Sequence, residues 1–74
     1  MSTKNQVTIS AVVNGEHRSF ATGTTLFGVV RTLELAPERL AIELDRAIIS
    51  RGLWDTTEVR DGAAIEIVMF VGGG

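Results

Sequence analysis

Apolar and polar residues alternate along residues 6–13. Every second position is apolar and most of the positions between are polar: Val7, Ile9, Ala11 and Val13 against Gln6, Thr8 and Ser10. A period of two is typical of a half-buried β-strand. Asn14-Gly15 follows at once, and because both residues tolerate positive φ, we predict a two-residue type I′ turn. The returning strand is predicted over residues 16–21, with Phe20 in the core.

The pattern then changes to a helical period. Apolar residues recur at i, i+3, i+4 and i+7, which is one stripe of an amphipathic helix: Leu26, Val29, Val30 and Leu33. Gly23-Thr24-Thr25 breaks the preceding strand and offers hydroxyl groups that can cap the helix. Pro37 disfavours helical geometry in the residue before it, so we predict that the helix ends near Glu34 or Leu35.

Shorter patterns fill the second half of the chain. Alternation over residues 40–44 predicts a third strand, and residues 47–50 can form a short fourth strand after a tight turn. Leu53-Trp54 is expected to close one end of the core. Asp61-Gly62 predicts a turn, and residues 64–71 form the last and most apolar strand.

The order of these elements predicts an α+β fold. A continuously apolar strand tends to be central in its sheet, so the last strand should have neighbours on both edges. The first strand can lie parallel to it only through a crossover such as the helix. We therefore predict the β-grasp (ubiquitin-like) arrangement, a mixed four- to five-stranded sheet with one helix on one face. Residues 6–71 form this domain, between a disordered segment over 1–5 and a flexible tail over 72–74.

Composition narrows the classes of function. The chain of 74 residues holds no Cys, which excludes disulfides, thiolate metal sites and thiol nucleophiles. Its seven basic residues are scattered and its net charge is −2, so we expect no nucleic-acid partner. The polar start lacks the apolar core of a signal peptide, and the longest apolar run, residues 67–71, is too short to span a bilayer. We expect a cytoplasmic protein without a membrane partner, monomeric when free.

The candidates for enzymatic chemistry are weak. His17, the one histidine, is expected on the returning strand and facing solvent, with no spacing that suggests a catalytic triad. The carboxylates fall in turns or at outward-facing strand positions, and their spacing matches no known metal-binding loop: Glu34, Glu38, Glu43, Asp45, Asp55, Glu58 and Asp61. We predict no catalytic residue and no metal site, hence a protein that is not an enzyme.

Three glycines, Gly72-Gly73-Gly74, follow the last strand directly. Such a run could be an unstructured terminus or an expression remnant. Its place immediately after a core strand favours a functional tail that reaches roughly 10 Å into a partner's active site. Adenylation by ATP would make the Gly74 carboxylate a good electrophile, and sulfur transfer would then give a terminal thiocarboxylate. Gly73 leaves the backbone free to adopt conformations that other residues resist.

Large apolar residues near this tail are candidates for docking. If Ile65, Ile67 and Met69 face the helix, then Val68 and Phe70 lie on the open face of the sheet, next to Val71. Exposed apolar residues beside a functional tail indicate a surface for partners. The alternative is that a loop or neighbouring side chains cover them.

The sequence resembles the ThiS family, the sulfur carriers of thiamine thiazole biosynthesis. The resemblance covers nearly all of the chain after about residue 6. It is carried by Val13-Asn14-Gly15-Glu16, the predicted helix, residues 40–44, Ser50-Arg51-Gly52-Leu53-Trp54, Arg60-Asp61-Gly62 and residues 65–74. The chain departs from the family pattern at Ser50, where Pro is frequent, and at Asp45-Arg46, where Asn and Gly are usual.

The resemblance implies both the chemistry and the partners. It implies adenylation of Gly74 by a ThiF-like adenylyltransferase that uses ATP, with Gly73 and Gly72 required for activation. It also implies a cysteine desulfurase-type sulfur donor and a ThiG-like thiazole synthase as acceptor. No cofactor would be bound, and the active form would end in 1-thioglycine.

Other readings share the glycine tail. A MoaD-type subunit of molybdopterin synthase and a sulfur carrier for cysteine synthesis would show the same terminus. A ubiquitin-like modifier would be conjugated to lysines. A plain β-grasp interaction module would have an inert tail.

Overall fold

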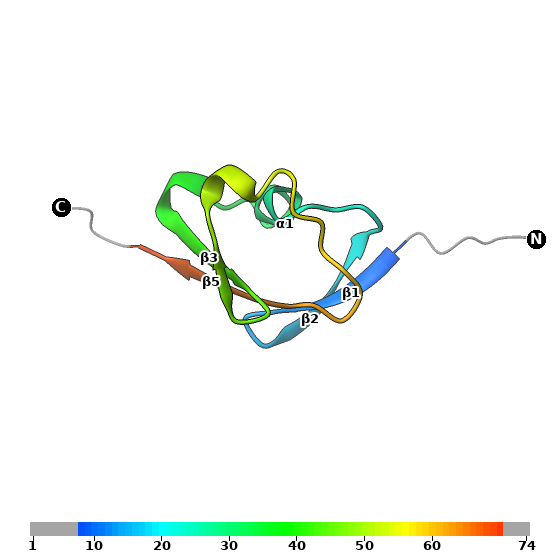
Figure 1. Cartoon of the computed structure of the whole chain (residues 1–74). Coiled ribbons are helices and arrows are strands. Elements are labelled where there is room, and N and C mark those ends of the chain that lie inside the picture. The colour runs from blue at the N-terminus through cyan, green and yellow to red at the C-terminus, as the bar shows by residue number, and fades with distance from the viewer. Residues whose placement is uncertain (1–7, 71–74) are drawn as a thin grey trace, which may run out of the picture.

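The computed structural model of the chain describes residues 8–70 (Figure 1). The segments predicted to flank the domain, 1–5 and 72–74, lie outside this range. The elements in chain order are β1 (Thr8–Val13), β2 (Glu16–Ala21), α1 (Leu26–Thr32), the 3₁₀ turn η2 (Pro37–Arg39), β3 (Leu40–Leu44), β4 (Ala47–Ile49), the 3₁₀ turn η3 (Arg51–Leu53) and β5 (Ala64–Met69).

The strands form one five-stranded sheet in the order β2-β1-β5-β3-β4. β1 and β5 are parallel, and the other neighbours are antiparallel. α1 crosses one face of this sheet (Figure 1). This is the predicted β-grasp fold, with the most apolar strand in the centre and the first strand parallel to it.

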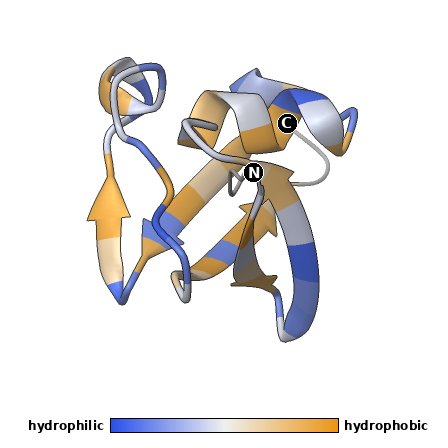
Figure 2. Cartoon of the chain, turned by 90° about the vertical axis from the view of Figure 1, so that its right-hand side faces the viewer, coloured by the Kyte–Doolittle hydropathy of each residue, from blue (hydrophilic) through white to orange (hydrophobic). Residues whose placement is uncertain are grey.

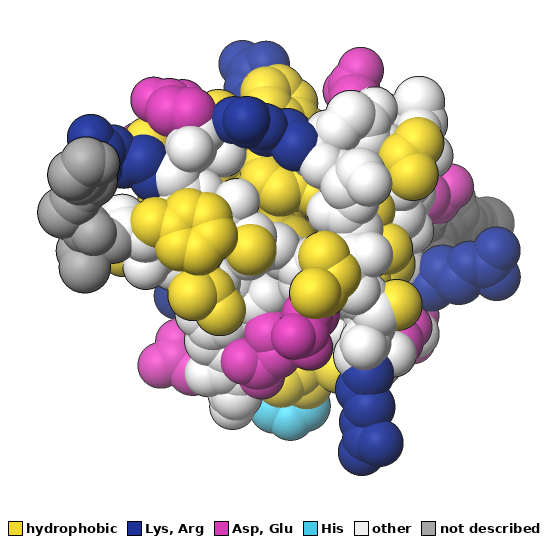
Figure 3. All heavy atoms as spheres, turned by 60° about the vertical axis from the view of Figure 1, so that its left-hand side comes forward, with side chains coloured by type: hydrophobic (Ala, Val, Ile, Leu, Met, Phe, Trp, Pro, Cys, Tyr) yellow, Lys and Arg dark blue, Asp and Glu magenta, His cyan; other side chains and the backbone are white. Residues whose placement is uncertain are grey.

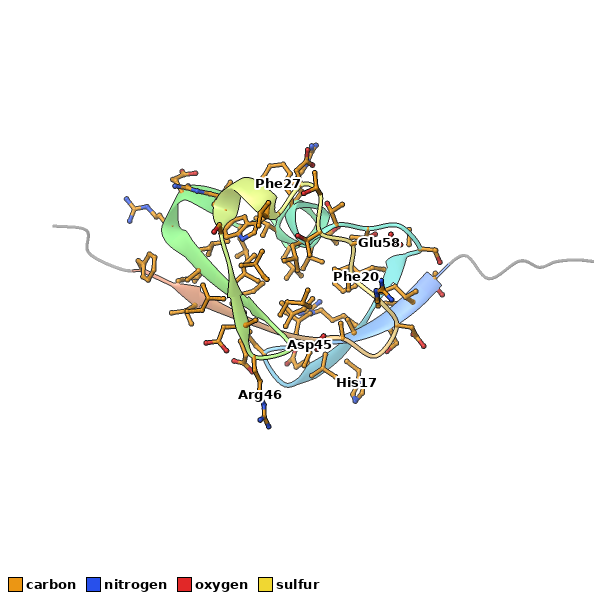
Figure 4. All side chains as sticks on the ribbon, in the orientation of Figure 1. His17, Phe20, Phe27, Asp45, Arg46 and Glu58 are labelled. Atoms are coloured by element: carbon orange, nitrogen blue, oxygen red, sulfur yellow. The ribbon has the colours of Figure 1, made fainter. Side chains whose placement is uncertain are left out.

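The β1–β2 hairpin forms as the alternation predicts. Asn14 (φ 50°) and Gly15 (φ 84°) both have the positive φ of a type I′ turn. Ala11 and Val13 are buried on β1, and Phe20 on β2 is 5% exposed. Phe20 points into the space between sheet and helix (Figure 4). Alternating apolar and polar bands along the strands are visible in Figure 2.

α1 begins as predicted but ends earlier. Thr25 caps it by accepting a hydrogen bond from the Gly28 N–H at 3.1 Å. The helix ends at Thr32 rather than at Glu34 or Leu35 because Glu34 takes a left-handed φ of 59°. The Glu34 N–H donates to the Arg31 carbonyl and the Leu35 N–H to the Val30 carbonyl, each at 3.0 Å, which is a Schellman C-cap.

The core closes with one correction to the prediction. Trp54 is buried to 1% exposure, and its indole Nε1–H donates to the Ile49 carbonyl at 2.9 Å. Leu53, expected beside it, is 55% exposed, because it belongs to η3 and that turn presents Trp54 to the core in its place.

Two strands are shorter than predicted. β4 ends one residue before the predicted boundary, at Ile49. β5 ends at Met69 rather than at residue 71.

The β3–β4 turn keeps its geometry with unusual residues. Asp45 (φ 50°) and Arg46 (φ 76°) fill the two central positions of a type I′ turn. The Asp45 N–H donates to the Ala64 carbonyl at 2.8 Å, and its Oδ1 accepts from the Ala64 N–H at 3.0 Å. Asp45 is thereby held, whereas the Arg46 side chain extends away from the sheet (Figure 4).

Replacing Arg46 with glycine should stabilise the protein. Relief of the left-handed strain outweighs the greater freedom of glycine in the unfolded chain, for a gain of about 0.5–1 kcal/mol. The Tm measured by circular dichroism should rise by about 2–8 °C. Arg46→Ala is the matched control, because it removes the same side chain but keeps the strain. An equal rise in Arg46→Ala would contradict this account.

Candidate functional site

The predicted reactive residue Gly74, its neighbours Gly73 and Gly72, and the docking candidate Val71 lie outside the described residues. The structure shows the strand from which they continue. β5 runs in the middle of the sheet and ends at Met69, and the Phe70 N–H still donates to the Arg39 carbonyl at 2.8 Å. The chain is therefore anchored up to four positions before Gly74.

β5 is held from both sides, but not equally. On one side it pairs with all of β3, from Leu44 opposite Ile65 to Leu40 opposite Met69. On the other side the pairing with β1 covers Val12 opposite Ala64 and Val13 opposite Ile65. Beyond that point β1 turns away into the hairpin.

The side chain of Asn14 continues the pairing after β1 has ended. Its Oδ1 accepts a hydrogen bond from the Ile67 N–H at 2.7 Å, and its Nδ2 donates to the Ile67 carbonyl at 3.2 Å. The Asn14 backbone N–H also donates to the Ile65 carbonyl at 2.9 Å. One residue thus forms the turn and satisfies the backbone of Ile67 as a neighbouring strand would. Asn14 fixes the strand close to where the glycines begin.

The side chains of β5 alternate between core and surface. Ile65 and Ile67 are buried, while Val68 (53% exposed) and Phe70 (56% exposed) are open to solvent, so the first of the two alternatives considered for them applies. Met69 shares the face of Ile65 and Ile67 but is 57% exposed, which corrects the expectation that it packs against the helix. The reason is the early end of α1, which leaves Met69 without a helical turn above it.

Met69 instead lines a groove of about 500 Å³ between the end of α1 and the hairpin. Its floor is apolar and one rim is polar. The lining residues are Val13, Asn14, Glu16, Arg18, Leu33, Leu35, Ile67 and Met69. On the rim, Arg18 and Glu16 form an exposed ion pair with an N–O distance of 3.4 Å.

The end of the molecule where β5 finishes carries a cluster of apolar side chains next to acidic ones (Figure 3). Besides Val68 and Phe70, the exposed large apolar residues include Ile48 on β4, at 75%. The sequence did not predict that Ile48 is an exposed member of this cluster. Its strand is too short to show a pattern, and the residues beside it are set by the register of the sheet. Nor did the sequence predict the role of Asn14. The residue type at position 14 could have indicated this role, since the side-chain amide of asparagine can both donate and accept hydrogen bonds.

The groups considered for enzymatic chemistry remain apart. His17 is exposed on β2 and points away from the core (Figure 4). Within residues 8–70, no three His, Asp or Glu side chains gather in a way that could hold a metal ion. No helix in that part of the chain is long and apolar enough to cross a bilayer.

The family model for ThiS matches residues 9–74. A crystal structure of a thiamine biosynthesis protein (ThiS) from Geobacter metallireducens superposes with a TM-score of 0.77 at 30% identity, covering 89% of this chain and 100% of that one. The thiazole synthase of Magnetococcus marinus is 40% identical over 62 residues, or 84% of this chain. That of Paramagnetospirillum magneticum is 33% identical over 63 residues, or 85%. The chain spans only 19% of the length of either synthase.

Replacing Asn14 with glycine should loosen β5 while preserving the turn. Glycine accepts the positive φ but removes both hydrogen bonds to Ile67, at a cost of about 1–3 kcal/mol. Thermal unfolding should show a lower Tm. Hydrogen exchange should accelerate at the Ile67 amide more than at the Phe70 amide, which donates to the Arg39 carbonyl on the other side of the strand and acts as the internal control. Unchanged exchange at Ile67 would contradict the role given to Asn14.

Proposed function

Because the chain belongs to the ThiS family, we propose that it is a sulfur carrier of thiamine biosynthesis whose Gly74 carboxylate is adenylated and then converted to a thiocarboxylate. The observation that supports this proposal is that the central strand β5 ends at Met69, with only Phe70 and Val71 between it and Gly72-Gly73-Gly74 in the sequence. Four residues beyond Phe70 reach at most about 14 Å. That is enough for Gly74 to enter an active site while the β-grasp domain stays outside it.

The chemistry needs little from the chain itself. In the first step a Gly74 carboxylate oxygen attacks the α-phosphorus of ATP, and pyrophosphate leaves. In the second, the terminal sulfur of a persulfide on a cysteine desulfurase-type donor attacks the acyl carbon, and AMP leaves. A thiol then reduces the resulting acyl disulfide, which releases the thiocarboxylate and leaves a disulfide between that thiol and the donor. The glycine offers an acyl carbon with no side chain beside it. The carrier supplies the carboxylate and the partners supply catalysis, so the chain is not an enzyme and binds no cofactor of its own.

The names of the relatives support thiazole synthase as the sulfur acceptor. Two proteins named thiazole synthase contain a segment similar to this chain within a much longer polypeptide. Fusion of a carrier to the enzyme it serves would raise the local concentration of the sulfur donor. A ThiF-like adenylyltransferase is the activating partner that the family resemblance implies.

Docking on these partners would use the exposed end of β5. Val68 is paired with Ala41 of β3, and the Phe70 N–H donates to the Arg39 carbonyl, so fixing these two positions costs little conformational entropy on binding. Val71 continues the same run. We propose these three residues as contacts for the enzymes that act on Gly74.

Removal of Gly73-Gly74 should leave the fold intact and abolish activation, because the truncated chain lacks the reacting carboxylate and the reach. The measurement is the intact mass after incubation with ATP, the adenylyltransferase of the same organism and a sulfur donor. The full chain should gain the difference between sulfur and oxygen. A truncated chain that is still adenylated would refute the carrier function. Isopeptide adducts on lysines of other proteins would favour the ubiquitin-like modifier.

Phe70→Ser should weaken docking without altering chemistry at the terminus. The loss of an apolar contact should raise KM for the carrier by about tenfold at little changed kcat. Pyrophosphate release measured against carrier concentration separates the two constants. Phe70→Leu is the control, since it keeps an apolar side chain and should retain most of the affinity. A fall in kcat at unchanged KM would contradict a docking role.

A further inference from the structure

The face of the sheet opposite α1 combines apolar and acidic residues in a fixed order. Glu43 on β3 lies directly opposite Glu66 on β5, and Ile48 on β4 lies opposite Glu43 on its other side. Directly opposed residues of adjacent strands point to the same face, with Cβ atoms about 4.5–5.5 Å apart. One row across the sheet therefore reads Ile48, Glu43, Glu66.

The next row towards the end of β5 is apolar. Ala41 lies opposite Val68, and Phe70 follows two positions later. Val68, Phe70 and Ile48 are each more than half exposed. We call Ile48, Glu43, Glu66, Val68 and Phe70 the docking face. Figure 3 shows acidic side chains beside the apolar cluster at this end of the molecule.

The two glutamates are an unfavourable pair in the free chain. Like charges placed directly opposite each other on a sheet are destabilising. The ion pair found within residues 8–70 joins Arg18 to Glu16, on a different part of the sheet, so neither Glu43 nor Glu66 forms an ion pair with a described residue. A negative site framed by large apolar side chains is complementary to a cationic side chain on an equally apolar surface.

The reach of the terminus indicates what covers this face. An enzyme that acts on Gly74 must come within about 14 Å of Phe70, because Gly74 lies only four positions after it. A protein surface that approaches from the exposed face of β5 at that distance also meets Val68 and Glu66.

We infer that the docking face binds the enzyme that activates Gly74 through an arginine or lysine side chain of that enzyme, seated between Glu43 and Glu66 and surrounded by apolar side chains. A guanidinium presents several donors in one plane and can bond two carboxylates at once. The inference rests on the proposed function, since that function identifies the activating enzyme as the partner. It adds the chemistry of the contact. The Glu43–Glu66 pair lowers the stability of the free chain and raises the affinity of the complex.

The test compares Glu43→Gln, Glu66→Gln and the double variant with the wild type in the full-length chain. Binding to the adenylyltransferase of the same organism is measured by calorimetry without ATP, at low and at high salt. Glu58→Gln is the matched control, because it removes the same charge from a segment paired with Thr25 at the start of α1. Each single substitution should weaken binding by about tenfold, and the control should leave it unchanged.

Two further readouts exclude a merely structural effect. Each substitution in the docking face should raise Tm by about 1–5 °C, because it relieves repulsion, so weaker binding cannot be ascribed to unfolding. Wild-type binding should weaken with salt, and the double variant should lose most of this dependence. At saturating enzyme, the double variant should still acquire sulfur at Gly74.

The outcomes separate the two proposals. A double variant with wild-type affinity and wild-type salt dependence would overturn the docking inference and leave the carrier function standing. Absence of wild-type binding would also overturn it. Binding that depends on the glutamates, without any conversion of Gly74, would overturn the proposed function and retain the docking face.

Discussion

The parallel pairing of the first and last strands is the contact on which the rest of the structure depends. It can form only after the helix has crossed the sheet, so it joins the two ends of the chain and places α1 over the core. The β1 ladder covers only Val12 and Val13, and Asn14 extends it to Ile67 with its side chain. The strand that leads to the glycines is thereby bonded along both edges.

Patterns in the sequence predict most of this arrangement because the decisive choices are local. Alternation places Ala11, Val13 and Phe20 in the core, and the helical period places Leu26, Val29 and Val30 there. The missed features depend on tertiary context. Glu34 ends the helix through a conformation that its residue type disfavours. Met69 is exposed because of that early end, and the strand-like role of Asn14 exists only once β1 and β5 are neighbours. No short window of sequence contains those causes.

The surface shows choices that stability alone does not explain. The described core contains no buried polar or charged side chain, which is the cheapest way for so small a domain to fold. The sheet face opposite α1 is less favourable for stability. Glu43 lies opposite Glu66 there, and the apolar side chains of Val68 and Phe70 are exposed to water. Natural sequences break local rules mostly where function requires it. The break falls at the end of β5, where the proposed partners would bind.

Core, docking face and terminus can therefore have separate tasks in the proposed mechanism. Free energy from the core holds β5 in place and is independent of the partner. Docking on Val68, Phe70 and the two glutamates needs only modest affinity, because a bound domain holds Gly74 near the partner's active site at an effective concentration that can reach the millimolar range. Reaction at the terminus then becomes effectively intramolecular. Weak docking also lets the carrier leave one enzyme and reach the next, which a carrier between partners must do.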